Sequence, residues 1–284
     1  FKDGIDIDHD EFFRRLTTGS DHPKTTQPSV EEFVSAYKPL VEQGHEIVSI
    51  HVSDKLSGTM NSARLACQEF PDAVIELVDT RLASLAMTLV VKSAAEAAST
   101  GADVATVVKL ANEVASKTEV FVVLDTLEYL QKGGRIGKAQ ALMGSILSVK
   151  PVLKLVDGEI HPHEKVRTRA KALQRMKDIA AEGAPHEEIA LIHKATAEEV
   201  AELTEYLGPL AKKPLISGQV GAVIGTHSGP GVIGFVLRIA DLGAKRGAVL
   251  VCCRLQVRNG DGNVIQAADH QVSLLSDLAL LWGL

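Results

Sequence analysis

Apolar and polar residues follow two different rhythms along this chain. Short runs rich in β-branched residues predict buried strands, and longer runs with an apolar residue at every third or fourth position predict helices. Glu46–Val52 (EIVSIHV) is typical of a buried strand. Ser29–Glu32 forms a capping box, which predicts that a helix begins there and precedes this strand. Because strands and helices alternate over the first third of the chain, we expect a parallel sheet there.

The pattern changes in the middle of the chain, where consecutive strands predict hairpins. The runs Pro151–Leu155 and Glu159–Val166 flank Asp157-Gly158, a pair that favours a tight type I′ turn. Farther along, a glycine-rich loop lies among three short expected strands, which are Pro214–Ile216, Ala222–Ile224 and Val232–Leu237. Antiparallel or mixed pairing is therefore expected in this part of the chain.

These two patterns meet near residue 117 and predict an α/β fold made of two α/β domains. The first, residues 1–116, is expected to hold a parallel sheet, and the second, residues 117–241, a mixed sheet. A length of 284 residues by itself allows one large domain or two ordinary ones. Residues 242–284 lack a clear rhythm before a leucine-rich end, so we interpret them as a tail of unassigned role, non-native or specific to a lineage.

Composition and charge narrow the classes of function. The 30 basic and 36 acidic side chains give a formal net charge of −6, which offers no attraction to a phosphate backbone, so no nucleic-acid partner is expected. The sequence contains no apolar run of about 18 residues, so we expect no membrane span. It also contains no basic segment followed by an apolar one at its start, so we expect no secretory signal. The 3 cysteines include an adjacent pair and no C-x-x-C spacing, so we expect no disulfide framework and a reducing, cytoplasmic location.

Two polar loops could approach a ligand closely. Pro23–Ser29 (PKTTQPS) places the hydroxyls of Thr25 and Thr26 just before a helix start, and a helix cap is the simpler interpretation. Gly225–Gly231 (GTHSGPG) surrounds His227 with glycines, which allow a backbone to lie against a ligand, while the histidine can bind an anion or move a proton. A tight turn with a solvated histidine is the simpler interpretation of this second loop.

A third polar loop, Leu56–Thr59 (LSGT), lies between a buried strand and a helix. Free amides at a helix start attract anions, and ligands of α/β sheets gather where strands end. Ser57 could also be a nucleophile, but the sequence around it lacks the G-x-S-x-G elbow, so a hydrolase is weakly supported. An ordinary Ser/Thr cap is the competing interpretation.

Two basic segments and one histidine pair complete the candidates. Lys132–Gly137 (KGGRIG) predicts a glycine break between helices, and Lys165–Arg169 (KVRTR) lies at an expected strand–helix junction. A solvated surface is the simpler interpretation of the second segment, and a docking patch for an acidic partner is the sharper one. His161 and His163 share one face of a strand, but two ligands alone do not make a metal site, so neither a metal nor another cofactor is expected.

Taken together, these loops resemble the DegV family of bacterial fatty-acid-binding proteins. The resemblance covers roughly residues 1–240 and rests on long segments in the expected order. The matching segments are PKTTQPS (Pro23–Ser29), SIHVSDKLSGTMNSA (Ser49–Ala63), LDTLEYLQKGGRIGKAQALMGSILSVKP (Leu124–Pro151), KVRTRAKAL (Lys165–Leu173) and GAVIGTHSGPGVIG (Gly221–Gly234). The family begins with a strand and an Asp-Ser-Thr-type loop that would precede residue 1.

The resemblance implies a two-domain α/β protein with a long-chain fatty acid buried between the domains. The carboxylate would be held by the TTQP and LSGT segments, which gives Thr25, Thr26, Ser57 and the Gly58 amide as binding groups, with His227 beside them. These donors are neutral, and we expect that they avoid the penalty of burying an unpaired carboxylate while leaving its oxygen free to attack a phosphoryl group. The resemblance also implies a partner, an ATP-dependent fatty acid kinase that converts the bound acid to acyl phosphate.

We therefore expect a carrier protein with no catalytic residue of its own. The surface that faces the kinase is predicted to include Arg167 and Arg169, whose planar guanidinium groups suit phosphate and carboxylate, together with His227. On an extended segment the two arginines would share a face. The alternative is an enzyme in its own right, either a Ser57/His227 hydrolase or a phosphotransferase of the dihydroxyacetone-kinase type.

Overall fold

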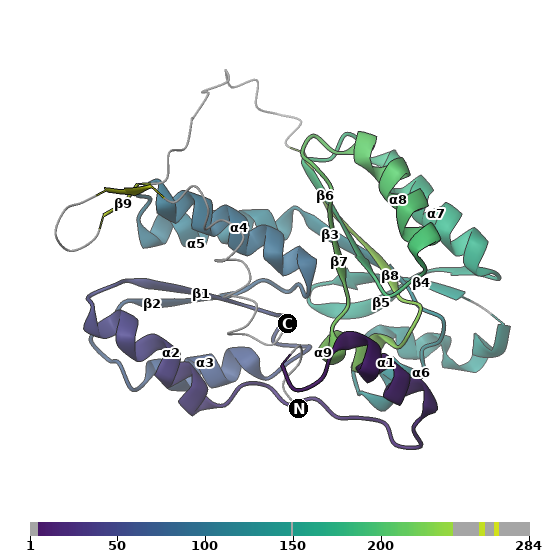
Figure 1. The fold of residues 1–284 in the computed structure, drawn as a ribbon, viewed down its shortest axis with the longest axis horizontal. Coiled ribbons are helices and arrows are strands. Elements are labelled where there is room, and N and C mark those ends of the chain that lie inside the picture. The colour runs from purple at the N-terminus through teal and green to yellow at the C-terminus, as the bar shows by residue number, and fades with distance from the viewer. Residues whose placement is uncertain (1–4, 149, 241–255, 259–263, 267–284) are drawn as a thin grey trace.

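The computed structural model describes residues 5–148, 150–240, 256–258 and 264–266. Its N-terminal layer is a two-stranded parallel sheet between two pairs of helices (Figure 1). Strand β1 (Ile47–His51) pairs along its whole length with β2 (Ile75–Asp79). The helices on the two faces are α2 (Val30–Glu42) with α3 (Thr59–Cys67), and α4 (Leu85–Ser99) with α5 (Val104–Ser116). The parallel sheet expected in the first third of the chain is confirmed.

Local sequence explains how this layer is assembled. The predicted capping box is present at α2, where the Glu32 amide donates to Ser29 Oγ at 3.2 Å and the Ser29 amide donates to Glu32 Oε2 at 2.8 Å. The helix then buries Phe33 and Tyr37 against Ile47 of β1 in a small apolar core. Burial of these large side chains fixes how α2 lies on the sheet.

The second sheet has six strands in the order β5-β4-β3-β8-β6-β7. Its pairs are antiparallel except for β6 with β7, so the mixed sheet expected here is confirmed. The strands are β3 (Thr118–Val123), β4 (Lys150–Val156), β5 (Glu159–Val166), β6 (Glu188–His193), β7 (Ile216–Gln219) and β8 (Ile233–Arg238).

Further helices and short segments surround these two sheets. The remaining helices are α1 (His9–Thr18), α6 (Glu128–Lys132), α7 (Arg169–Glu182), α8 (Ala197–Leu207) and α9 (Ala222–Ser228), with 3₁₀ segments η1 (Gly137–Ser148) and η2 (Gly208–Leu210). Near the C-terminus, β9 (Gln256–Arg258) pairs antiparallel with β10 (Val264–Gln266). The rest of the expected tail, residues 242–284, lies outside the described residues. In the described part of the chain, no helix combines the length and apolarity needed to cross a membrane.

The six-stranded sheet has two faces with different neighbours. On one face Phe121, Leu191 and Phe235 pack with α7 and α8 in a buried core, and Figure 1 shows these two helices along the outer side of the sheet. The opposite face looks toward α4 and the N-terminal layer. There Val120 and Val122 of β3 are only partly buried. The next subsection describes the space over them.

Two local predictions are wrong and one is confirmed. The expected strand Ala222–Ile224 is the start of helix α9, which packs against α1 so closely that a Cβ on the next residue, Gly225, would lie 2.5 Å from Phe13 Cζ. The strand expected at Pro214–Ile216 begins only at its last residue, since proline lacks the amide hydrogen that a strand ladder requires. The turn at Asp157-Gly158 is confirmed, with φ values of 47° and 80°.

Candidate functional site

A cavity of about 830 Å³ lies between the N-terminal layer and the six-stranded sheet. We call it the interlayer cavity. Most of its wall is apolar and comes from the inner face of the sheet, from α9 and from the loop after β1. The apolar residues that line it include Val52, Leu56, Val120, Val122, Leu124, Leu155, Ile160, Ile192, Val220, Val223, Ile224 and Val232. Such a wall suits a flexible hydrocarbon ligand.

The predicted polar loops meet at one end of the interlayer cavity, although they are far apart in sequence. Thr25, Thr26, Ser57 and His227 all line it. Thr25 Oγ1 and His227 Nε2 are 2.9 Å apart and hydrogen-bonded across 202 positions of sequence. Gly58 lies just behind this wall, with the Gln27 amide group packed against it so closely that a Cβ there would be 2.9 Å from Gln27 Nε2. We call this group the polar end.

Ser57 has two local partners at the start of α3. Its Oγ lies 2.8 Å from Thr59 Oγ1 and accepts a hydrogen bond from the Thr59 amide at 3.3 Å. The Ser57 amide donates to the Ser53 carbonyl oxygen at 3.1 Å. The interpretation as an ordinary Ser/Thr cap is wrong, because the N-cap of α3 is Gly58 and has no side-chain cap, although Ser57 bonds the first amide of the helix. The hydroxyl pair of Ser57 and Thr59 still lines the cavity, and α3 has no acidic residue in its first turn that would repel an anion.

His227 is held neutral in this setting. Burial, followed by the positive charge of Arg135 and by His22, lowers its pKa to about 4. Its Nδ1 atom is buried without a hydrogen-bond partner and lies against Gly133, where a Cβ would come within 2.1 Å of it. Glycine at position 133 therefore makes room for the imidazole ring. The expected glycine-rich loop around His227 is wrong in one respect, since His227 lies in the last turn of α9.

Arg135 is a site residue that the sequence reasoning missed. Its guanidinium lines the interlayer cavity, donates from Nε to the Leu56 carbonyl oxygen at 2.9 Å, and donates from Nη1 to the Gly133 carbonyl oxygen at 2.7 Å. It ties the KGGRIG segment to the LSGT loop. The expectation of purely neutral donors is therefore incomplete, because a cation stands beside them. The signal available was the arginine after two glycines in a segment interpreted only as a helix break.

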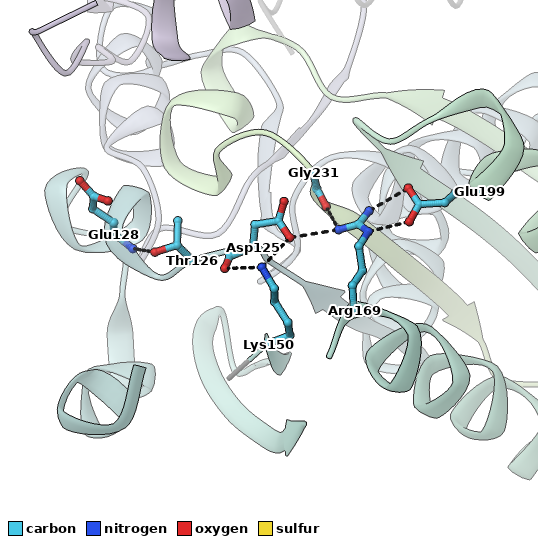
Figure 2. Close-up of polar contacts among 7 residues, drawn as sticks. All are labelled: Asp125, Thr126, Glu128, Lys150, Arg169, Glu199 and Gly231. Atoms are coloured by element: carbon cyan, nitrogen blue, oxygen red, sulfur yellow. Dashed lines mark hydrogen bonds and ion pairs between the residues drawn. The ribbon is translucent and has the colours of Figure 1, made fainter. Parts of the chain in front are cut away.

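Arg169 holds several loops together where the central strands β3 and β8 meet their connecting segments, as Figure 2 shows. Its Nε and Nη2 atoms donate to Glu199 at 2.6 and 3.1 Å, and its Nη1 donates to the Gly231 carbonyl oxygen at 2.7 Å and to Asp125 Oδ1 at 3.3 Å. Lys150 Nζ donates to Asp125 Oδ1 from the other side at 3.1 Å. The chain that follows α9 is thus anchored to α7, α8 and the end of β3.

The two predicted docking arginines therefore differ in their surroundings. Arg169 is the first residue of α7, with Thr168 as its N-cap, so the expectation that both arginines share one face of an extended segment is wrong. The helix begins here because Thr168 Oγ1 accepts a hydrogen bond from the Lys171 amide at 3.2 Å. Arg167 lies in the bend before this helix and is exposed.

The geometry of a serine hydrolase is not assembled at the polar end. In this described region, Ser57 bonds Thr59 while the imidazole of His227 bonds Thr25, so the two are not joined to each other by a hydrogen bond. A nucleophilic serine needs a base within hydrogen-bond reach. The arrangement is better suited to holding a small anionic group with hydroxyl donors and an arginine nearby.

Comparisons with known proteins agree with this description. A family model described as "Uncharacterised protein, DegV family" matches residues 1–239. A DegV domain-containing protein of Streptomyces coelicolor is 42% identical over 219 residues, which cover 75% of this chain and 77% of that protein. A fatty-acid-binding DegV family protein from Thermus thermophilus has a solved structure with a TM-score of 0.78 and 33% identity, covering 84% of this chain and 87% of that one. A stearic-acid-binding protein from Eubacterium ventriosum has a TM-score of 0.73 and 28% identity, covering 83% and 85%.

Proposed function

The chain belongs to the DegV family, and from this premise we propose that it binds a long-chain fatty acid in the interlayer cavity and presents the carboxylate to a fatty acid kinase. One observation carries the first part of the proposal. A cavity of about 830 Å³ has an apolar wall over most of its extent, and the hydroxyls, the histidine and the arginine that line it come from loops that contact one another. An amphipathic ligand with a long tail and one acidic head matches that division.

The apolar wall supplies the binding free energy. Burying a methylene group is worth about 0.8 kcal/mol, so a long acyl chain contributes on the order of 10 kcal/mol before the cost of ordering it. The volume lies within the range of roughly 300–1,000 Å³ that is common for small-molecule sites. Solved relatives that bind fatty acids, one of them stearic acid, support this ligand class.

The polar end supplies orientation. A carboxylate taken out of water needs hydrogen-bond donors, and Thr25, Thr26, Ser57 and the Gly58 amide are the groups proposed to provide them. Arg135, next to His227, adds a positive charge that favours the ionised acid. Because Arg135 already donates to two backbone carbonyl oxygens, it is held in place and need not form a tight ion pair with the ligand. The acyl oxygen can then remain a nucleophile toward an incoming phosphoryl group.

Presentation to a kinase is the second part of the proposal. The chain would bind the acid without transforming it, and the ATP-dependent partner would supply the chemistry, in a cytoplasmic setting. Arg167 is proposed as a docking residue because it is exposed and its guanidinium suits phosphate or carboxylate. Arg169 contributes by anchoring the chain after α9, and His227 lies where the acyl carboxylate would meet the partner.

Ligand binding is tested by native mass spectrometry of the purified protein, followed by lipid extraction. We expect a co-purified fatty acid whose mass gives the chain length. Ser57→Ala and Thr26→Val, each removing one hydrogen bond to a charged group worth about 1.5–3 kcal/mol, should weaken fatty acid binding about tenfold or more. Ser35→Ala is the matched control, because Ser35 also lines the cavity but its hydroxyl donates to the Glu31 carbonyl oxygen at 2.7 Å. Unchanged affinity in both site variants would contradict the carboxylate assignment.

Presentation is tested separately by kinase-dependent formation of acyl phosphate. Arg167→Ala should bind fatty acid as the wild type does yet slow acyl phosphate formation, while Lys171→Ala removes one positive charge from an exposed position of α7 and should change neither. His227→Ala should slow formation further, with its fatty acid affinity measured alongside. Normal rates in both Arg167→Ala and His227→Ala over a range of carrier concentrations would rule out the proposed surface.

A further inference from the structure

One row of residues across the six-stranded sheet contains two glycines, and only one of them is covered. In the register of the sheet, Val122 of β3 pairs with Gly234 of β8, Gly234 pairs with Ile192 of β6, and Ile192 pairs with Gly218 of β7. Paired residues of neighbouring strands point to the same face. These four positions therefore share the face that looks toward the interlayer cavity.

The space that a side chain would occupy is filled at Gly218 and open at Gly234. A Cβ on Gly218 would meet Leu85 Cδ1 of α4 at 3.3 Å, so a leucine from the facing layer fills that space. The three atoms nearest to a Cβ on Gly234 would all come from its own sheet: the Phe121 carbonyl oxygen at 3.3 Å and the Cβ atoms of Ile192 and Val122 at 3.7 and 3.8 Å. Gly234 also lines the cavity, so the space above it is open to a ligand.

The open space over Gly234 lies between two apolar side chains, since the vacant Cβ position is 3.7 Å from the Ile192 Cβ and 3.8 Å from the Val122 Cβ. Non-bonded carbon atoms pack best at about 3.5–4.0 Å, so a hydrocarbon chain would lie above the Gly234 Cα with these two side chains on either side of it. Val122 and Ile192 thus form the walls of a notch with Gly234 as its floor. Among the residues of β8 itself, Gly234 is the one that lines the cavity.

The notch joins two parts of the interlayer cavity. On one side of β8 the lining comes from β3, β4 and β5, through Val122, Leu155 and Ile160. On the other side it comes from Ile192 of β6 and from Val220 just after β7. A side chain at position 234 would stand between these two parts, because side chains on a strand project roughly perpendicular to the sheet.

We propose that the acyl chain crosses β8 over Gly234, between Val122 and Ile192, and that the absence of a side chain at this position sets the length of chain that the protein accepts. This inference rests on the proposed fatty acid binding and extends it to chain-length selection. Gly234 would then determine specificity for chain length, whereas the groups of the polar end hold the carboxylate.

The experiment compares affinities of the lipid-stripped full chain for straight saturated acids from decanoate to stearate. In the wild type each added methylene should tighten binding about fourfold until the cavity is full. In Gly234→Val, and less strongly in Gly234→Ala, this gain should stop at a shorter chain, so that the loss grows with length and reaches tenfold or more for stearate. Gly218→Ala is the matched control, since it adds a methyl group in the same row with the same 3.3 Å nearest contact, and it should keep the wild-type dependence on length.

Different results would contradict the role of Gly234 and the proposed fatty acid binding. Wild-type dependence on chain length in folded Gly234→Ala and Gly234→Val, or an equal loss at every length, would overturn the notch. Absence of fatty acid binding in the wild type would overturn the proposed function itself. If the Gly234 variants do not fold, Val122→Ala tests the same notch from its wall. Widening it should improve binding of a methyl-branched acid over its straight isomer by several-fold, and no change in that ratio would reject the proposal.

Discussion

The two faces of the six-stranded sheet are formed by the same strands but have different roles: the outer face packs against helices, and the inner face borders the interlayer cavity. On the outer face, Phe121, Ile233 and Phe235 are almost completely buried against α7 and α8. On the inner face, the alternating neighbours Val122 and Gly234 are smaller and border the interlayer cavity. The sheet is therefore packed along its outer face and leaves part of its inner face open to a ligand.

This difference shows how a strand can separate stability from function. Successive side chains of a strand point to opposite faces, so every second residue can be chosen for packing and every other for the shape of a cavity. The outer face can be filled to the density of a protein interior. The inner face keeps β-branched residues and a glycine, whose lost packing is compensated by the other face.

The largest expected effect tests this division directly. Phe235→Ala on the outer face should lower the free energy of unfolding by about 3–5 kcal/mol, because it leaves a cavity in a fully buried core. Val122→Ala on the inner face should cost about 1 kcal/mol or less, since its side chain already borders open space. Denaturant unfolding of both variants without ligand measures the contrast, and equal losses would show that the two faces are not divided in this way.

A second prediction concerns the ends of the central strands β3 and β8, where Arg169 joins the segments that follow and precede them. Arg169→Gln removes the paired hydrogen bonds to Glu199 and the contacts to Asp125 and Gly231, and should cost about 2 kcal/mol of unfolding free energy. That is less than a fully buried pair would cost, because the Arg169 side chain is 24% exposed. Arg167→Gln, at an exposed position, is the control and should unfold like the wild type. Equal stability of the two variants would remove Arg169 from the role of anchor.

The smallest expected effect is a dependence of the unfolding free energy on pH, which arises from His227 at the polar end of the cavity. Burial and the charges of Arg135 and His22 lower the pKa of His227 to about 4, below its unfolded value near 6.5. The unfolded chain therefore binds a proton first as the pH falls, and stability is lost between about pH 6.5 and pH 4. His227→Gln should lack this loss. Between pH 7 and pH 4 the unfolding free energy of the wild type should therefore fall by about 1 kcal/mol or more beyond any fall in the variant. A constant difference across that range would contradict the assignment.

Buried His51 provides an internal comparison for that measurement. Burial lowers its pKa to about 4 as well, and its Nε2 atom lies 2.8 Å from Ser49 Oγ, which in turn contacts Tyr37. It belongs to the packed N-terminal layer and does not line the cavity. Its share of the acid sensitivity should remain in His227→Gln and should not respond to added fatty acid.

Local sequence by itself determined the elements whose reasons are local. The capping box at Ser29 and the turn at Asp157-Gly158 follow from hydrogen bonds and backbone preferences within four residues, and both were predictable. The parallel and mixed sheets followed from the order of strands and helices. The loops of the polar end were found because hydroxyls and free amides at strand and helix ends can bind an anion as well as cap a helix, and the family resemblance that they carried is confirmed.

Tertiary structure decided what depends on neighbours distant in sequence. The run Ala222–Ile224 is a helix because α1 packs against it, and Arg169 is an anchor because Glu199, Asp125 and Gly231 converge on it from three segments. Arg135 became a site residue only through its reach to Leu56. The notch at Gly234 depends on which glycine a facing leucine covers, and local sequence cannot encode that choice, because the covering atom comes from a helix more than a hundred residues away.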